Sequence, residues 1–194
     1  MRATLLLLTF VISLLPPVTQ AQDREGRDTA GAWRPTYQET YGIWRVVCDE
    51  RDRVAGVEGD VEPRCYIRYV DVFSPAPAFA AQFMFITPET GGLRVEFGTE
   101  PGTRFTNDGF RIEDWVGIQW STQNRGCLFG GECVFEGDAA IPLLDAMRDQ
   151  GALRFTFTDR HGSAQDLSWP LTGFDSAFSD FLAQSDARGL PYLQ

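Results

Sequence analysis

Short runs of β-branched and aromatic residues, separated by turn-forming residues, recur along the chain from Tyr41 onward. The run LRFTFTD at 153–159 shows the pattern, because Leu153, Phe155 and Phe157 alternate with polar residues. Successive side chains of a strand point to opposite faces of a sheet, so this run predicts a strand with one buried face and one wet face. A chain built mainly of such runs is constrained to an antiparallel β fold.

The runs and the turns between them indicate about eight strands. The connecting segments TPETGG, TEPGT, TNDG and DRHGS supply the Gly, Pro, Asn and Asp that tight turns favour. About eight strands in a chain of this length predict either an antiparallel β-sandwich or a closed barrel. The expected strands fall at 43–48, 64–72, 79–87, 93–98, a pair near 109–120, 133–137, 153–159 and 166–171.

Two segments depart from this alternation and predict helices. In DAAIPLLDAMRDQG, Ile141, Leu144 and Met147 recur at helical spacing. Asp138 is the expected N-cap of this short helix, and Gly151 lies just past its end. Near the C-terminus, GFDSAFSDFLAQ predicts an amphipathic helix whose apolar stripe covers the sheet. The stripe consists of Phe174, Ala177, Phe178, Phe181 and Leu182.

The N-terminal sequence MRATLLLLTFVISLLPPVTQA has the layout of a secretory signal peptide, with one basic residue, an apolar run from Leu5 to Leu15 and small residues before Gln22. The apolar run is shorter than the roughly 20 residues that a membrane span needs. We therefore expect residues 1–21 to be removed, leaving no membrane span. Residues 22–40 are polar and contain Gly and Pro, and they predict a flexible segment before a single β-rich domain at 41–194.

The charge of the chain argues against polyanionic partners. Asp and Glu number 27 against 17 basic residues, all of them Arg, and the formal net charge is −10. An acidic surface repels nucleic acid and anionic lipid headgroups. We expect no nucleic-acid partner.

Four cysteines, Cys48, Cys65, Cys127 and Cys133, remain to be assigned. An even number of cysteines in an exported protein favours two disulfides, for which three connectivities exist. The local pairing, Cys48 with Cys65 and Cys127 with Cys133, closes two short loops and is the one we predict. The alternatives are a metal site, which would need closer spacing or histidines, and a redox pair, which would need a two-residue spacer at a helix. We expect neither a metal nor a cofactor.

The same segments resemble the invasion-associated locus B family of exported bacterial proteins. The resemblance covers about Tyr41 to Gln184 and rests mainly on two patterns. The opening pattern W-x-V-x-C is formed by Trp44, Val46 and Cys48, and the closing pattern by Leu171, Gly173 and Phe174. The resemblance implies a single-domain β protein located in the periplasm, secreted or in the outer envelope, which binds an envelope or host protein. It implies no catalytic residues.

A hydrolase is the first alternative to a binding protein. The sequence contains no G-x-S-x-G, no H-E-x-x-H and no phosphate-binding loop. The single histidine, His161, lies in the turn DRHGS between Asp159 and Asp166, and no nucleophile accompanies it in the sequence. We interpret this cluster as a solvated hairpin tip, so the protein is expected not to be an enzyme.

The second alternative is a module that binds a small molecule or a glycan, and its candidate residues are Trp115 and Trp120. They lie five positions apart in IEDWVGIQWSTQ, an odd spacing, so a regular strand would point them to opposite faces. One of them is then expected in the core, and the other could lie at the surface, where it could stack on a sugar ring or pack against a protein. The alternative, which we favour, is that both are partly buried against loops.

Overall fold

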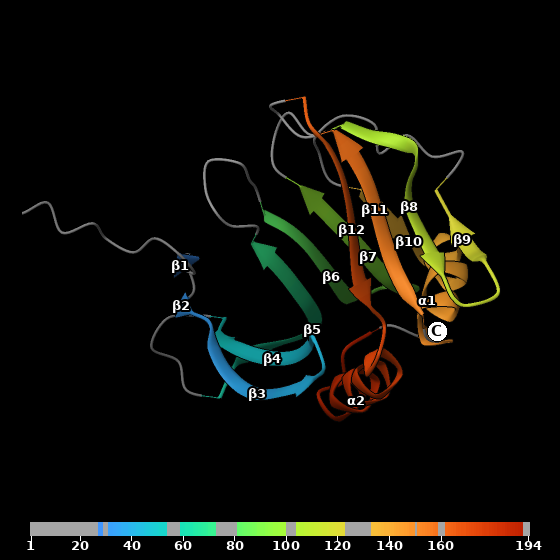
Figure 1. Ribbon diagram of the computed structural model, residues 1–194. Helices are drawn as coiled ribbons and strands as arrows, with labels where there is room; N and C mark the ends of the chain where they lie inside the picture. The colour runs from blue at the N-terminus through green and yellow to red at the C-terminus, as the bar shows by residue number, and fades with distance from the viewer. Residues whose placement is uncertain are drawn as a thin grey trace, which may run out of the picture.

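Two antiparallel sheets packed face to face form the body of the protein (Figure 1). The computed structural model describes residues 27–28, 31–53, 59–72, 81–99, 104–122, 133–149, 151–158 and 162–191. The larger sheet has six strands in the order β10-β7-β6-β5-β4-β3, and the smaller has four in the order β12-β11-β8-β9. Each sheet is an open row of strands, so the structure confirms the sandwich and not the closed barrel.

The strand bounds agree with the expected runs from residue 43 onward, whereas the strands before it were not expected. The larger sheet contains β3 (Arg34–Tyr41), β4 (Trp44–Asp52), β5 (Val61–Val72), β6 (Ala81–Glu89), β7 (Gly92–Thr99) and β10 (Cys133–Glu136). The smaller sheet contains β8 (Arg104–Glu113), β9 (Ile118–Ser121), β11 (Ala152–Thr158) and β12 (Ala164–Pro170). A short hairpin of β1 (Arg27–Asp28) and β2 (Gly31–Ala32) precedes them.

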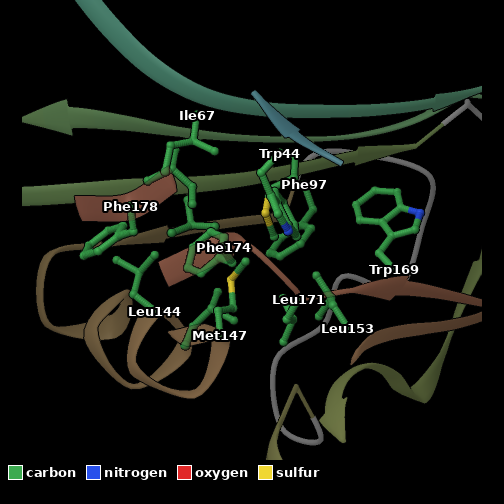
Figure 2. Packing of buried hydrophobic residues seen from close by; sticks show 14 of the residues in the cluster. Trp44, Ile67, Phe97, Leu144, Met147, Leu153, Trp169, Leu171, Phe174 and Phe178 are labelled. Atoms are coloured by element: carbon green, nitrogen blue, oxygen red, sulfur yellow. The ribbon is translucent and has the colours of Figure 1, made fainter. Parts of the chain in front are cut away.

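Alternation along each strand decides which side chains enter the core. In β11, Leu153, Phe155 and Phe157 are buried, whereas the residues between them are only partly buried. Aromatic rings then join the sheets across the core: Phe97 of β7 lies 4.7 Å from the ring of Phe110 of β8. Figure 2 shows Phe97 among the buried residues that the sheets and helices contribute. Such aromatic pairs stabilise a core beyond their buried area.

The helices follow the two segments that were predicted, but the first begins later than expected. Gly137–Ala139 form a 3-10 turn, η1, and α1 spans Ile141–Arg148 with Ala140 as its N-cap. Asp138 is therefore not the cap, because it lies inside η1. Pro142 occupies the first turn of α1, where its missing amide needs no partner. Ile141 is also not in the core but 53% exposed, since it begins the helix on its outer side.

The second helix, α2 (Phe174–Ala187), confirms the predicted stripe. Phe174, Ala177, Phe178 and Phe181 are buried, and Leu182 is partly buried against the core. Figure 2 shows that Phe174 and Phe178 lie close to Leu144 and Met147 of α1, so the two helices share one apolar cluster.

Gly173 sets the start of α2. Its φ is +85°, and a Cβ there would lie 2.9 Å from the carbonyl oxygen of Tyr41. Glycine tolerates both the left-handed backbone and the close approach. The helix therefore docks directly onto the end of β3.

The N-terminal segment differs from the expectation. Residues 34–40, which the sequence indicated as flexible, belong to β3, the edge strand beside β4. Most side chains of β3 are exposed, so it lacks the apolar alternation that marks the other strands, and Pro35 is tolerated because an edge strand has free N–H positions. Trp33, just before β3, packs its ring against the Arg64 guanidinium, 3.7 Å from the ring centroid. Tyr37, inside β3, donates a hydrogen bond to Asp180 of α2. Residues 1–21 lie outside the described residues, as does most of 22–33.

In the part of the chain that the structure describes, no helix is long and apolar enough to cross a membrane.

Candidate functional site

The Cys48–Cys65 disulfide is confirmed. The two residues are directly opposite each other on β4 and β5, and neither has any exposed surface. Cys133 is also disulfide-bonded, whereas Cys127 lies outside the described residues, so its pairing with Cys133 stays a prediction. The Cys48–Cys65 bridge lies inside the core and joins paired strands, which is a structural position.

The hairpin cluster is described only in part. His161 and Asp159 lie outside the described residues. Asp166, on β12, is exposed and forms a salt bridge with Arg154 of β11, which also binds Glu113 of β8. The carboxylate of Asp166 is thus part of an ion-pair network across three strands of the smaller sheet.

The two candidate tryptophans lie in different environments. Trp120 is on β9, partly buried, with its ring centroid 5.4 Å from that of Phe135. Trp115 is 95% exposed and lies in the turn between β8 and β9. The favoured alternative, that both tryptophans are partly buried, is wrong for Trp115, and the turn rather than strand alternation is the cause of its exposure.

Trp115 is part of an apolar turn, which we define as residues 114–118. Val116 is 68% exposed and Ile118 is 57% exposed. Three of the five exposed large hydrophobic side chains among the described residues are therefore in this one turn. Scattered apolar side chains on a surface are ordinary, but a cluster of them marks a candidate interaction site.

Asp114 holds the 114–118 turn in shape. Its Oδ1 accepts hydrogen bonds from the backbone N–H groups of Val116, at 2.6 Å, and Gly117, at 3.0 Å. The same oxygen accepts a bond from the side-chain amide of Gln119, at 3.1 Å, and the N–H of Asp114 donates to the carbonyl of Gly117. The N–H of Val116, followed by that of Gly117, holds the pKa of the Asp114 carboxyl below its ordinary value. The turn is therefore preorganised by an anion that stays ionised at neutral pH.

The base of the turn is fixed to the sheet. Glu113 accepts hydrogen bonds from Arg111 and Arg154, and the bond from Arg111 is the main reason that its pKa is lowered. Gly151, with a φ of +113°, lies so close to the carbonyl of Glu113 that a Cβ would collide with it. A side chain carried on such an anchored turn loses little freedom when it binds.

The sequence alone named Trp115 and Trp120 without deciding which of them is exposed, and it missed the rest of the turn. The segment Asp114-Trp115-Val116-Gly117 contained a usable signal, because an aspartate followed by a glycine three residues later favours a turn with side-chain-to-backbone bonds. Strand alternation was applied across this segment and hid the turn. Recognising it would have predicted that Val116 and Ile118 accompany Trp115.

The turn can bind but carries no reacting group. Trp115, Val116 and Ile118 offer apolar area, and Oδ1 of Asp114 and both carboxylate oxygens of Glu113 already accept hydrogen bonds. A tryptophan buries roughly 150–250 Å² when it enters a pocket, and residues of this type dominate binding energy in interfaces.

Comparisons with known proteins add little. No protein-family model matches the chain, and no curated protein matches it. Among solved structures, the chain is similar to the crystal structure of invasion associated protein B from Bartonella henselae, at 15% sequence identity and a TM-score of 0.44, over 78% of this chain and 99% of that chain. A similarity at this level carries no argument about function.

Proposed function

We propose that this chain is an exported, non-enzymatic envelope protein that binds a protein partner by inserting Trp115 into an apolar pocket of that partner. The observation that carries the proposal is the exposure of Trp115, Val116 and Ile118 on a turn that Asp114 holds rigid. An exposed indole costs solubility, and a rigid turn that presents one is suited to docking.

A protein pocket fits the turn better than a membrane or a glycan. Asp114 and Glu113 lie at the base of the turn, and the whole chain carries a net charge of −10, so an anionic bilayer would repel it. A sugar site needs polar groups beside the ring that can bond to hydroxyls. Oδ1 of Asp114 already accepts three hydrogen bonds from within the turn and from Gln119, so at most one oxygen of this carboxylate is left for a sugar hydroxyl.

Export is supported by the sequence and by one disulfide. Residues 1–21 have the layout of a signal peptide, and Cys48 and Cys65 are bonded in the core. Disulfides of this kind form in the periplasm or outside the cell and are rare in the cytosol. The place of action is accordingly the periplasm or the outer envelope, or the protein is secreted.

Membership of the invasion-associated locus B family is part of the proposal. Trp44 and Cys48 of the opening pattern, and Gly173 and Phe174 of the closing pattern, all occupy buried or close-packed positions. The motif residues therefore serve the fold, which explains how a family could keep them while its partners differ. The proposed partner is a protein of the envelope or of a host cell.

A site-specific photo-cross-linker tests the proposal. It is placed at Trp115 and, as a matched control, at Gln38, which is exposed on the opposite edge of the protein in β3. We expect a discrete protein adduct in intact producing cells from position 115 and not from 38. The partner identified in this way is then purified, and Trp115→Ala should weaken its binding by at least about tenfold, as expected for a central aromatic anchor.

Several outcomes would contradict this function. A lipid adduct at position 115, equal adducts at both positions, or unchanged affinity of Trp115→Ala would each reject the turn as a protein-docking site. A change in tryptophan fluorescence with one member of a glycan panel, lost in Trp115→Ala, would favour the glycan module instead. If the combined variant Asp159→Asn, His161→Ala, Asp166→Asn stays folded and exported but reproduces the phenotype of a gene deletion, the protein is an enzyme.

A further inference from the structure

Two arginines face each other in the larger sheet. Arg45 of β4 and Arg68 of β5 are directly opposite in the antiparallel register, so both side chains project from the same face of the sheet. They line a cavity of about 360 Å³ together with Ile43, Tyr69 and Val70. We call this cavity the paired-arginine pocket. Its lining residues belong to β4, to the turn between β3 and β4, and to β5, all in the larger sheet, whereas the 114–118 turn joins β8 and β9 of the smaller sheet. Figure 1 shows where these strands lie.

Neither arginine has an acidic partner among the described residues. In the same part of the chain, eight other arginines form salt bridges with Asp or Glu, and Arg188 binds Gln184. The strand neighbours on either side are neutral: Thr40 is opposite Arg45 on β3, and Phe85 is opposite Arg68 on β6. In a chain with 27 acidic and 17 basic residues, an unpaired pair of arginines is a specific arrangement.

Like charges directly opposite each other on adjacent strands repel, and this repulsion destabilises the pair. Both side chains are partly buried, which strengthens the repulsion because water screens it less. An anion placed between the two guanidinium groups would replace the repulsion by two attractive contacts. The pocket is thus unfavourable when empty and suited to a negative ligand.

The walls of the pocket restrict the chemistry of that ligand. Ile43 and Tyr69 are partly buried against the core, and Val70 is 44% exposed. Tyr69 borders the pocket through its place in β5, but it follows Arg68 directly, so its ring projects from the core face, where it contacts Trp169. Apolar walls beside two cations favour an organic anion over a fully hydrated inorganic one. A guanidinium binds a carboxylate through two parallel hydrogen bonds, and a cavity of this volume lies at the lower end of the range for small-ligand sites.

We propose that the paired-arginine pocket binds an organic carboxylate that carries a compact apolar group, with Arg45 and Arg68 holding the carboxylate and Ile43 and Val70 contacting the apolar part. The carboxylate belongs either to a free small acid or to the C-terminus of a peptide. This site is separate from the 114–118 turn and does not depend on the function proposed for it.

Calorimetric titration of the purified protein tests the site with two pairs of probes. Phenylacetate is compared with its neutral amide, phenylacetamide, and N-acetylglycylphenylalanine is compared with its C-terminal amide. We expect both acids or one of them to bind, neither amide to bind, and the affinity to fall as salt is raised. Binding by phenylacetate alone identifies a free acid, and tighter binding by the peptide acid identifies a C-terminus.

The arginine variants assign the binding to this pocket. Arg45→Gln and Arg68→Gln should each weaken binding by about tenfold or more, as expected when a charge-assisted hydrogen bond is lost. Arg53→Gln is the matched control, because Arg53 follows the same strand but pairs with Asp60 and is distant in register from Arg45. The proposal is overturned if acids and amides bind alike, if neither acid binds, if inorganic phosphate binds more tightly than both acids, or if the Gln variants keep full affinity.

Thermal unfolding without ligand separates a binding role from a structural one. Because the two arginines repel each other, Arg45→Gln and Arg68→Gln should unfold at the same or a higher temperature than the unmodified protein at low salt. A clearly lower unfolding temperature for both variants, with Arg53→Gln unchanged, would show that the pair supports the fold and would reject the proposal.

Discussion

Removing the Cys48–Cys65 disulfide should lower the free energy of unfolding by about 4 kcal/mol. The two cysteines are 17 positions apart in the sequence, and closing a loop of this length restricts the unfolded chain by about 3 kcal/mol. Both sulfur atoms are fully buried, so Cys48→Ala with Cys65→Ala also leaves a small void, which adds about 1 kcal/mol. Against a total stability of about 5–15 kcal/mol, this loss is large.

Urea denaturation followed by tryptophan fluorescence measures the effect. With an m-value of about 2 kcal/mol/M, the midpoint should fall by about 2 M, and m should rise because the unfolded chain is no longer held together. The matched control is Cys127→Ala with Cys133→Ala, whose shorter predicted loop corresponds to about 2 kcal/mol. A loss below about 1 kcal/mol for the Cys48–Cys65 variant, or a loss smaller than that of the control, would refute the reasoning from loop length and burial.

Three further substitutions test the core, a buried hydroxyl and an ion pair. Phe181→Ala removes a fully buried ring of α2 and should lower the free energy of unfolding, measured by urea denaturation, by about 3–5 kcal/mol. The control Ser179→Ala, on the exposed side of the helix, should change it by less than about 0.5 kcal/mol. Similar values for both variants would mean that the stripe is not part of the core. Ser185→Ala should raise stability by about 1 kcal/mol, because the Ser185 hydroxyl is buried and finds no hydrogen-bond partner among the described residues, and a loss of stability would reveal a partner. Glu113→Gln should lower stability by about 1 kcal/mol at neutral pH. The pKa of Glu113 is lowered by Arg111, so the stabilisation is present above its ordinary value near 4.5 and disappears as the pH falls through the lower folded value. Thermal unfolding of both proteins between pH 7 and pH 2.5 should therefore converge at the acid end, and a constant difference would contradict the assignment.

The strands could be predicted because their side chains alternate between core and solvent. β11 illustrates this, since Leu153, Phe155 and Phe157 are buried and their neighbours are not. The same reasoning failed for β3, where both faces are largely exposed and pairing with β4 is made by the backbone. Backbone hydrogen bonds leave no pattern in the sequence, so an edge strand with polar side chains looks like a flexible segment.

Of the residues in the 114–118 turn, only Trp115 was named as a candidate from the sequence. Trp115 was identified from its type, but its exposure depends on the turn that Asp114 organises, and that turn was treated as strand. The facing of Arg45 and Arg68 could not be predicted either, because it requires the register of β4 against β5. A shift of one residue in that register would place the two arginines on different faces of the sheet. Such juxtapositions depend on three-dimensional pairing and not on local spacing.

The distribution of arginines shows where this protein is free to bind. On the outer faces of both sheets, arginines and carboxylates pair across neighbouring strands, as in Arg51 with Glu62 of β5 and Arg154 with Glu113 and Asp166. Paired charges are costly to strip of water and partners, so these faces are poor docking surfaces. The uncommitted groups of the described chain include the apolar side chains of the 114–118 turn and the two arginines of the pocket. They lie on different sheets and differ in chemistry, one apolar and convex, the other cationic and concave. If both proposals hold, the protein can bind a partner and a carboxylate at the same time. A titration with the protein partner, repeated in saturating phenylacetate, should then give an unchanged affinity. A changed affinity would show that the two sites are coupled through the shared core.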